Sequence, residues 1–287
     1  MRFLIAGVAI LAYAHRSTPR WRPRGREEWA LAGVAGAFII GGHHAFLYLG
    51  QQHVSGAVAA VVVSLGPVLT ALFAVLVLDE RLATPDVLGF SLGLLGVFLV
   101  AQPGVAGSAS LPFAARLAAL DLGALLTTNA IGIVLVVLAA GCFAIGAVLT
   151  RPFETDLPVE TTQAWAMLLG AALLLAVSGL RGESLGAIRW TPVASLPLAY
   201  LGTVTGAGAF LIYFELLDRV GPTNSNLIGY LEPVCATVLS WLVLGQLIDP
   251  LTGLGFAAIL LGFLCLRRRS LLSLLGAHTP IDSSRRR

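Results

Sequence analysis

Apolar residues gather into long blocks along this chain, and short polar or charged segments separate them. The blocks have roughly the 20 residues that an α-helix needs to cross a hydrocarbon core of about 30 Å. A preceding stretch, Arg2–Ala14, is also apolar but short for a crossing. We therefore predict an all-α polytopic membrane protein with the following further spans: Trp29–Gly50, Gly56–Leu78, Val87–Ala101, Ile131–Thr150, Thr162–Leu180, Ala194–Leu216, Thr223–Gly245 and Leu251–Leu266.

An internal repeat relates the two halves of the chain. One offset of 166 positions, without a gap, pairs Pro67 with Pro233, Leu78 with Leu244, Glu80 with Gln246, Gly89 with Gly255, and Gly96 with Gly262. Repeats of this kind define an architecture, so we predict two transmembrane repeats, 1–102 and 130–268. Between them lies an external linker, 103–129, and after them a tail, 269–287. Within the linker, Leu111–Leu122 forms either a short interfacial helix or irregular chain.

Composition and charge agree with this interpretation. The chain is 57% hydrophobic and 11% charged, whereas an ordinary soluble domain carries about 25% charged residues. If the arginine-rich segment 15–28 is cytoplasmic, alternation of the spans leaves 14 arginines inside and 4 outside, Arg2 among the latter. The two repeats then have opposite orientations in the membrane, and the C-terminus is cytoplasmic. Inverted repeats are typical of secondary transporters, whose substrate site lies near the midplane between the halves.

Glu232 is the first candidate site residue, because a carboxylate inside a span is costly and by default marks function. Pro233 beside it withholds a backbone donor, and Pro67 is its counterpart, so both predict opened helices. Ser225 and Gly229 share a helical face with Glu232. Two interpretations of Glu232 stay open: a carboxylate that carries protons or meets a cationic substrate group, and a structural carboxylate bonded to the freed backbone.

Further polar residues are candidates to line a cavity. His43 and His44 lie within one predicted span, where they either relay protons or join helices through hydrogen bonds. Tyr48 lies at the predicted outer mouth, Asn226 lies at the inner mouth, and Trp165 contributes from another span. Each of these three is also explained by packing or by anchoring at the membrane surface.

Several function classes have no support in the sequence. It contains no nucleophile elbow, phosphate loop or zinc-protease motif, so we predict no enzyme and no cofactor. The cysteines lie apart in apolar segments, and neither they nor the histidines have the spacing of a metal site. No nucleic-acid-binding signature is present. The expected partners are a small-molecule solute and the lipid bilayer, while Gly89 and Gly93 favour close helix contact within one chain or in a homodimer.

Two blocks carry a family resemblance, Ser64–Leu82 with Leu-Asp-Glu-Arg-Leu at its end, and Leu217–Val234 with Leu-Glu-Pro near its end. In order, spacing and duplication, the chain resembles the EamA-like members of the drug/metabolite transporter superfamily over nearly its whole length. The resemblance implies ten helices in two inverted repeats of five around a central cavity, with both termini cytoplasmic. Met1-Arg-Phe looks like the start of the second helix of that family, so about nine helices are expected here. Gln246 stands where such proteins commonly have Glu.

The resemblance further implies a secondary transporter that moves a metabolite, an amino acid or a drug by alternating access. Export driven by a proton gradient is the main expectation. A solute exchanger or facilitator of the same fold, and a non-transporting membrane assembly subunit, are the alternatives.

Overall fold

The computed structural model describes residues 1–78, 84–101, 115, 128–183, 186, 190–213, 215–216, 235, 238–239, 242–243 and 250–276. Within these residues the regular structure is helical, and no strand is present among them. Five of the described helices are long and apolar enough to cross a bilayer, and Val87–Val100 and Pro250–Cys265 are shorter apolar helices. The predicted all-α polytopic membrane fold is confirmed.

The first half of the chain folds into α1 (Arg2–Ser17), α2 (Gly25–Val34), the π-helix η1 (Ala35–Gly42), α3 (His43–Gly50), α4 (Gly56–Val63), α5 (Gly66–Leu78) and α6 (Thr84–Ala101). The second half contributes α8 (Thr128–Leu149), α9 (Val159–Leu180), α10 (Pro192–Gly202), the π-helix η4 (Thr203–Gly208) and α13 (Pro250–Gly276). Apart from Ala115, the predicted interfacial helix lies outside the described residues, as does most of the predicted span Thr223–Gly245.

Two differences from the predicted spans have physical causes. The α13 helix runs past the arginines at 267–269 to Gly276, because a helix satisfies its own backbone and can continue from the membrane into water. The predicted span Gly56–Leu78 is interrupted, since α4 ends at Val63 and α5 begins at Gly66. Pro67 is thus the second residue of α5, in the first helical turn, where the missing N–H removes no helical hydrogen bond.

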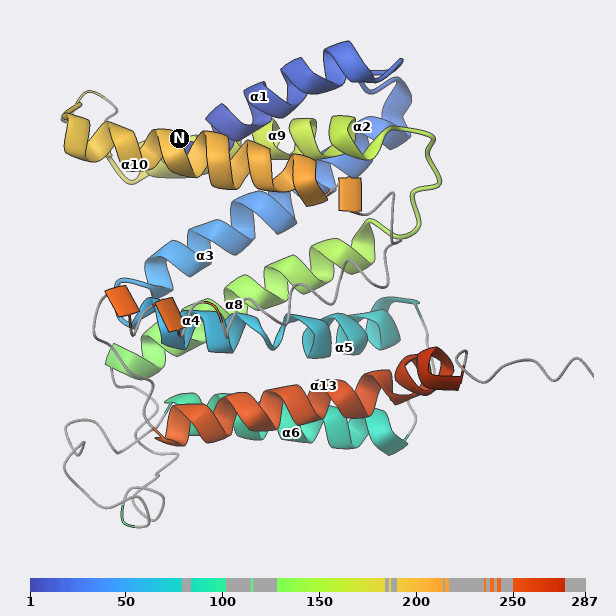
Figure 1. Ribbon diagram of the computed structural model, residues 1–287, viewed down its shortest axis with the longest axis vertical. Coiled ribbons are helices and arrows are strands. Elements are labelled where there is room, and N and C mark those ends of the chain that lie inside the picture. Colours follow the sequence, from blue (N-terminus) through green and yellow to red (C-terminus); the bar gives the residue numbers. More distant parts are fainter. Residues whose placement is uncertain are drawn as a thin grey trace, which may run out of the picture.

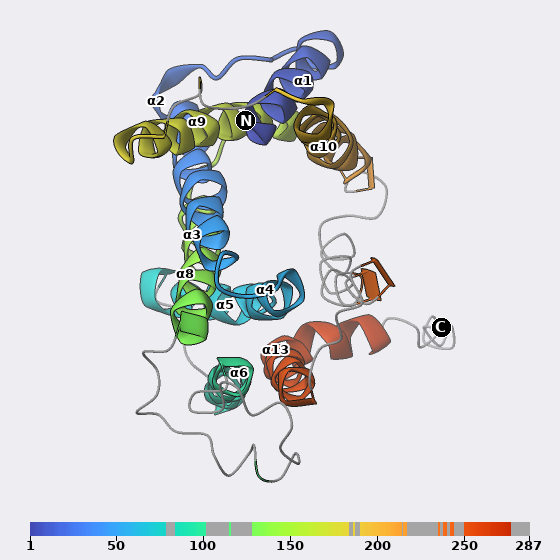
Figure 2. The ribbon, with the colours of Figure 1, turned by 90° about the vertical axis from the view of Figure 1, so that its left-hand side faces the viewer.

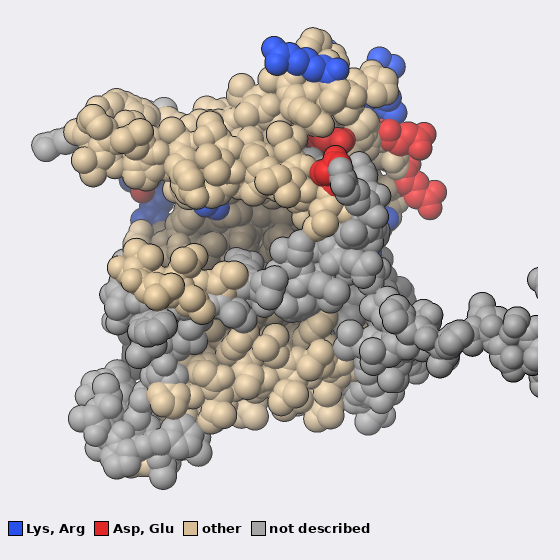
Figure 3. Space-filling view, in the orientation of Figure 1, with Lys and Arg blue, Asp and Glu red and all other residues tan. Residues whose placement is uncertain are grey.

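Figures 1 and 2 show how the helices are arranged. The α1, α9 and α10 helices lie together at one end of the molecule, and α6 and α13 lie side by side at the other. The α3 and α8 helices pack on each other and connect these two layers. In Figure 3 the surface is hollowed below α10, over the region where Figure 1 shows α3.

Large apolar side chains on α10 and the residues after η4 are exposed rather than packed. Val193 is 85% exposed, Leu196 68% and Ile212 72%. Such a surface would promote association in water but suits contact with lipid chains or with other membrane helices. The exposure pattern therefore agrees with the membrane fold.

The α6 and α13 helices contact each other through backbone atoms at glycines. A Cβ atom added to Gly255 would lie 2.5 Å from the Gly96 carbonyl oxygen, and one added to Gly262 would lie 2.5 Å from that of Gly89. The repeat offset of 166 converts the Gly89–Gly262 contact into the Gly255–Gly96 contact. The two helices are therefore antiparallel and related by a pseudo-twofold axis that passes between them, midway between Gly89 and Gly96. Such an axis relates inverted repeats.

A second pair of contacts obeys the same symmetry. Gly36 of η1 packs on α9, where an added Cβ would meet Leu169 Cβ at 3.0 Å, and its counterpart Gly202 packs on α1, where it would meet Ile5 Cβ at 2.7 Å. Both repeats also contain a π-helix at this place, η1 and η4, which end at residues related by the offset. The α1 and α9 helices are thus counterparts, with an offset of 164 that matches Ile5 to Leu169.

We predict that Gly255→Ala destabilises the protein by about 1–3 kcal/mol, because the new methyl group would overlap the Gly96 carbonyl and push α6 and α13 apart. Thermal unfolding of the purified protein in detergent measures the change. Gly253→Ala on the same helix is the control, since an added Cβ there meets nothing within 4 Å and alanine favours the helix. Equal melting temperatures for the two variants would contradict the close contact.

Candidate functional site

Only some of the residues predicted to form the site lie in the part of the chain that the structure describes. Glu232, Pro233, Ser225, Asn226 and Gly229 lie outside the described residues. The structure describes the remaining candidates, and it divides them between two places that are far apart. His43, His44 and Tyr48 lie on α3, next to the start of α1, whereas Trp165 contacts the connection that follows α1. With about 1.5 Å of rise per residue, the 16-residue α1 separates these places by roughly 24 Å.

His43 joins two helices. Its side chain is 7% exposed, and its Nδ1 lies 2.9 Å from the Ala139 carbonyl oxygen of α8. A carbonyl oxygen only accepts hydrogen bonds, so Nδ1 is the donor and Nε2 is unprotonated in the neutral ring. The Phe143 ring of α8 also contacts the imidazole, at 5.6 Å between centroids. The bond to Ala139 agrees with one of the two interpretations of His43, a hydrogen bond between helices, the other being a proton relay.

His44 faces α1 instead. Its Nδ1 lies 2.9 Å from the Ile40 carbonyl oxygen, one turn earlier on the same span, so this bond leaves the ring free to contact other helices. The ring centroid is 4.3 Å from that of Phe3 on α1 and 5.7 Å from that of Tyr48. As in His43, the donor role of Nδ1 leaves Nε2 as an acceptor in the neutral ring. This nitrogen is the position at which His44 would take up a proton.

Arg2 completes the cluster, although the arginine count predicts only that it lies on the outer side. Its guanidinium carbon lies 4.5 Å from the centroid of the Phe3 ring and 5.6 Å from that of Tyr48. Its Nε is buried and has no hydrogen-bond partner among the described residues. The sequence does contain a signal for this placement: Arg2 directly precedes Phe3 at the start of an apolar run, and it is the first residue of α1.

The polar residues of this cluster break the internal symmetry. His43 and His44 correspond to Ala209 and Phe210 in the second repeat, and Arg2 corresponds to Ala166. Glu232 has Gly66 as its counterpart. Packing glycines recur in both repeats, as shown above, but these ionisable residues do not. Since the shared scaffold does not need them, they are the positions at which to seek function.

Trp165 holds the connection between α1 and α2. Its Nε1 donates to the Trp21 carbonyl oxygen at 3.1 Å, and its ring lies 4.8 Å from that of Trp29. One turn earlier, the Thr161 hydroxyl donates to the Arg20 carbonyl oxygen at 2.7 Å. Two hydrogen bonds from successive turns of α9 therefore fix the backbone at residues 20 and 21, and the ring contact packs α9 on α2. The contacts of Trp165 agree with its interpretation as a packing residue and not as a residue that lines the cavity.

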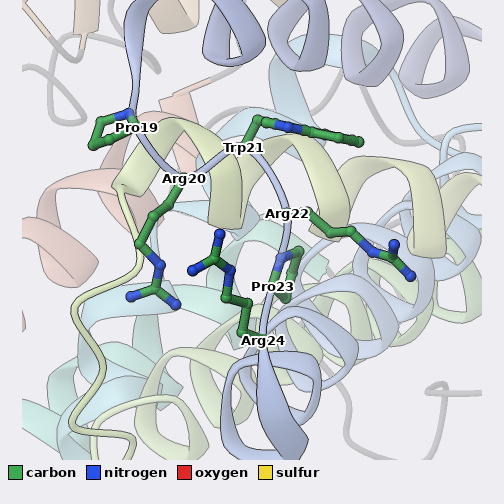
Figure 4. Close-up of a pocket in the computed structure, with 6 residues that line it drawn as sticks. All are labelled: Pro19, Arg20, Trp21, Arg22, Pro23 and Arg24. Carbon is green, nitrogen blue, oxygen red and sulfur yellow. The ribbon is translucent and has the colours of Figure 1, made fainter.

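Arginines surround a concavity of about 370 Å³ on this connection. Figure 4 shows Arg20 and Arg24 directed to one side of the chain and Arg22 to the other. The Glu28 carboxylate binds the Arg20 guanidinium and accepts a hydrogen bond from the Arg24 backbone N–H, while Glu28 itself is 8% exposed. Glu28 thereby clamps the start of α2 to the connection.

Metal chemistry has no support in the part of the chain that the structure describes. No group of three or more His, Cys, Asp and Glu side chains that could hold a metal ion occurs there. The histidine pair adjoins an arginine and aromatic rings, which supply no metal ligand beyond the imidazoles. The arginine of the cluster can instead stabilise negative charge.

Comparison with known proteins identifies the class of molecule. A family model described as "EamA-like transporter family" matches residues 1–102 and 130–268. A solved crystal structure with 21% sequence identity has the same fold, with a TM-score of 0.57, and the alignment covers 94% of this chain and 86% of the other.

Curated relatives align over most of their length. A protein of Streptantibioticus cattleyicolor named "Probable terminal-alkyne amino-acid exporter" is 27% identical, with 97% of this chain and 86% of the relative covered. Protein PecM of Dickeya dadantii is 25% identical, with 99% and 86% covered. The uncharacterized transporter YyaM of Bacillus subtilis is 24% identical, with 83% and 72% covered.

We predict that Glu28→Gln lowers the stability by about 1–3 kcal/mol, because a neutral amide cannot accept hydrogen bonds at both of its ends and leaves Arg20 without its ion pair. The melting temperature in detergent and the rate of trypsin cleavage at Arg20–Arg24 measure the effect. Glu27→Gln is the matched control on the neighbouring exposed residue. If both variants melt and cleave alike, the clamp contributes nothing.

Proposed function

The chain belongs to the EamA-like transporter family, and from that premise we propose that it exports a small organic solute by alternating access. The membership and the transporter relatives establish a multi-pass membrane protein that transports small solutes and is not an enzyme. Export is the direction named for the S. cattleyicolor relative. The proposed solute class is a metabolite such as an amino acid, or a drug.

The paired glycine contacts carry the proposal of alternating access. Because Gly89–Gly262 and Gly255–Gly96 are the same contact seen from the two repeats, the repeats can exchange conformations by a small movement about the axis between α6 and α13. Inverted repeats of this kind produce inward-facing and outward-facing states of similar energy from one scaffold. The substrate then lies between the repeats, near the residues that differ between them.

Glu232 is the proposed proton carrier. It lies in an apolar segment of the length of a span, beside Pro233, and an ionisable residue there is costly unless it is used. Ser225, Gly229 and Asn226 form the small, polar surroundings that we propose for it, and Pro233 marks the opened helix. Proton release from Glu232 to one side and uptake from the other would couple solute movement to the proton gradient.

His44 is a second proposed group in the proton path. Its Nδ1 bond to Ile40 fixes the ring and leaves Nε2 to accept a proton. His43 has its donor committed to α8, so we assign it the role of holding α3 against α8 while the repeats move. Pro67 ends the interruption between α4 and α5, and we propose that this interruption is the counterpart of the one at Pro233.

The proposed orientation has the arginine-rich connection after α1, and the C-terminus, on the cytoplasmic side of the plasma membrane. The five arginines of segment 15–28 support this orientation, because cytoplasmic loops carry the excess of arginine. The outer side then holds Arg2 and Tyr48.

We predict that Glu232→Gln abolishes proton-coupled export while leaving the protein in the membrane, because the amide is similar in size but cannot exchange a proton. The measurement compares the metabolites of medium and cytoplasm in cells that express each form at verified membrane levels. Glu183→Gln, a carboxylate on the exposed turn after α9, is the control and should export normally. Unchanged export by Glu232→Gln would assign Glu232 to the fold alone.

The orientation generates a separate prediction. A fluorescent protein fused after Arg287 should fold and fluoresce, whereas alkaline phosphatase at the same position should be inactive, because it matures only outside the cytoplasm. The opposite pair of results would place the C-terminus outside and reverse the assignment of every loop.

A further inference from the structure

We infer that Arg2 binds a carboxylate of the transported solute, with Tyr48 and His44 as the other walls of this anion site. The inference rests on the proposed function and adds a substrate class to it, namely solutes that carry a carboxylate group. The three residues come from α1 and α3, which contact each other through Phe3 and His44.

The hydrogen-bonding capacity of Arg2 is incompletely used. A guanidinium has five N–H donors in a planar fork. The guanidinium carbon lies 5.6 Å from the centre of the Tyr48 ring, and the Nε–H is buried without a partner among the described residues. Within the same residues no salt bridge to Arg2 is present, although Arg20 and Arg181 each have one. A partly buried guanidinium with donors in one plane is suited to a bidentate carboxylate.

The surroundings favour an anion with an apolar body. The rings of Phe3 and Tyr48 lie against the guanidinium and hold it in place, at 4.5 and 5.6 Å. Tyr48 is 40% exposed, so the cluster is accessible rather than sealed. The His44 ring contacts Phe3 edge-on, and the bond of its Nδ1 to the Ile40 carbonyl oxygen fixes it as a side wall of the site. An amino acid or another apolar carboxylic acid fits these groups.

The alternative role of Arg2 is to anchor α1 by reaching a lipid phosphate at the membrane surface. The aromatic contacts oppose it, since they hold the side chain over α1 and α3. The two roles also respond differently to substitution. A lysine reaches a lipid phosphate as well as an arginine does, but it cannot bind a carboxylate through two parallel hydrogen bonds.

The experiment profiles the medium of cells that express the native chain, Arg2→Lys, Arg2→Gln or Arg181→Gln, at matched membrane levels. Arg181 is the control, since it is another arginine on the outer side in the proposed orientation and half-exposed. The probes are the solutes that the native chain enriches outside, and the carboxamide of one of them. Each probe is added to everted membrane vesicles, and its uptake into the vesicles is measured.

The expected result is that the enriched solutes carry a carboxylate and that the native chain takes up the carboxamide roughly tenfold to a hundredfold less efficiently than the acid, the loss of a charged hydrogen-bonded pair. Arg2→Gln should lose uptake of the acid by a similar factor and should no longer distinguish acid from amide. Arg2→Lys should show an intermediate loss, and Arg181→Gln none.

Each other outcome overturns the inference in a recognisable way. Enriched solutes without a carboxylate, or equal uptake of acid and amide by the native chain, would refute the anion site while leaving the exporter intact. Full activity of Arg2→Lys and Arg2→Gln would assign Arg2 to membrane anchoring or to nothing. If the native chain enriches no solute, the proposed export fails first. The comparison of acid with amide needs no variant, so misfolding of Arg2→Gln does not prevent the decision.

Discussion

The contact between the α6 and α13 backbones is the constraint on which the rest of the described structure depends. At Gly96 and Gly255 there is no room for a methyl group, and the same is true where Gly262 meets Gly89. Inside a bilayer the hydrophobic effect does not drive helices together, so close van der Waals contact of this kind has to hold them. Because the contact occurs twice, related by the internal repeat, it also fixes the axis about which the two halves are arranged.

The residues that repeat in both halves are packing glycines, whereas the candidate functional residues each occur in one half only. The glycines that pack α6 on α13 recur at the offset of 166, as do Gly36, which packs η1 on α9, and Gly202, which packs α10 on α1. Arg2, His44 and Glu232 have apolar or glycine counterparts. A transporter needs both properties, since identical halves make two opposite-facing states equivalent in energy, whereas a solute and a proton need chemically specific groups. The one-sided positions of the ionisable residues are therefore the strongest pointer to the site.

Much of the fold follows from the sequence, because a bilayer imposes simple rules on it. The length of each apolar block predicted a helix, and the offset between Gly89 and Gly255 predicted the relation that the contacts obey. The end of α13 was not predictable from charge, since the arginines after Leu266 mark where a helix leaves the hydrocarbon and not where it stops. The π-helical turns of η1 and η4 left no signal beyond small residues, because they arise from how these segments pack on α9 and α1.

The candidate site could be predicted from the sequence only in part, because its contacts depend on how the helices pack. Composition identified His43 and His44 as polar residues in a span, but only the contacts separate them, with His43 bound to α8 and His44 turned toward Phe3. Charge counting assigned Arg2 to the outside and stopped there, because a count does not register that the side chain lies between two aromatic rings. The Nε of this arginine is buried without a hydrogen-bond partner among the described residues, no described counter-charge pairs with the side chain, and a partly desolvated cation is stabilised when an anion binds. That need for an anion, rather than the general electropositivity of the chain, is what relates Arg2 to a transported acid.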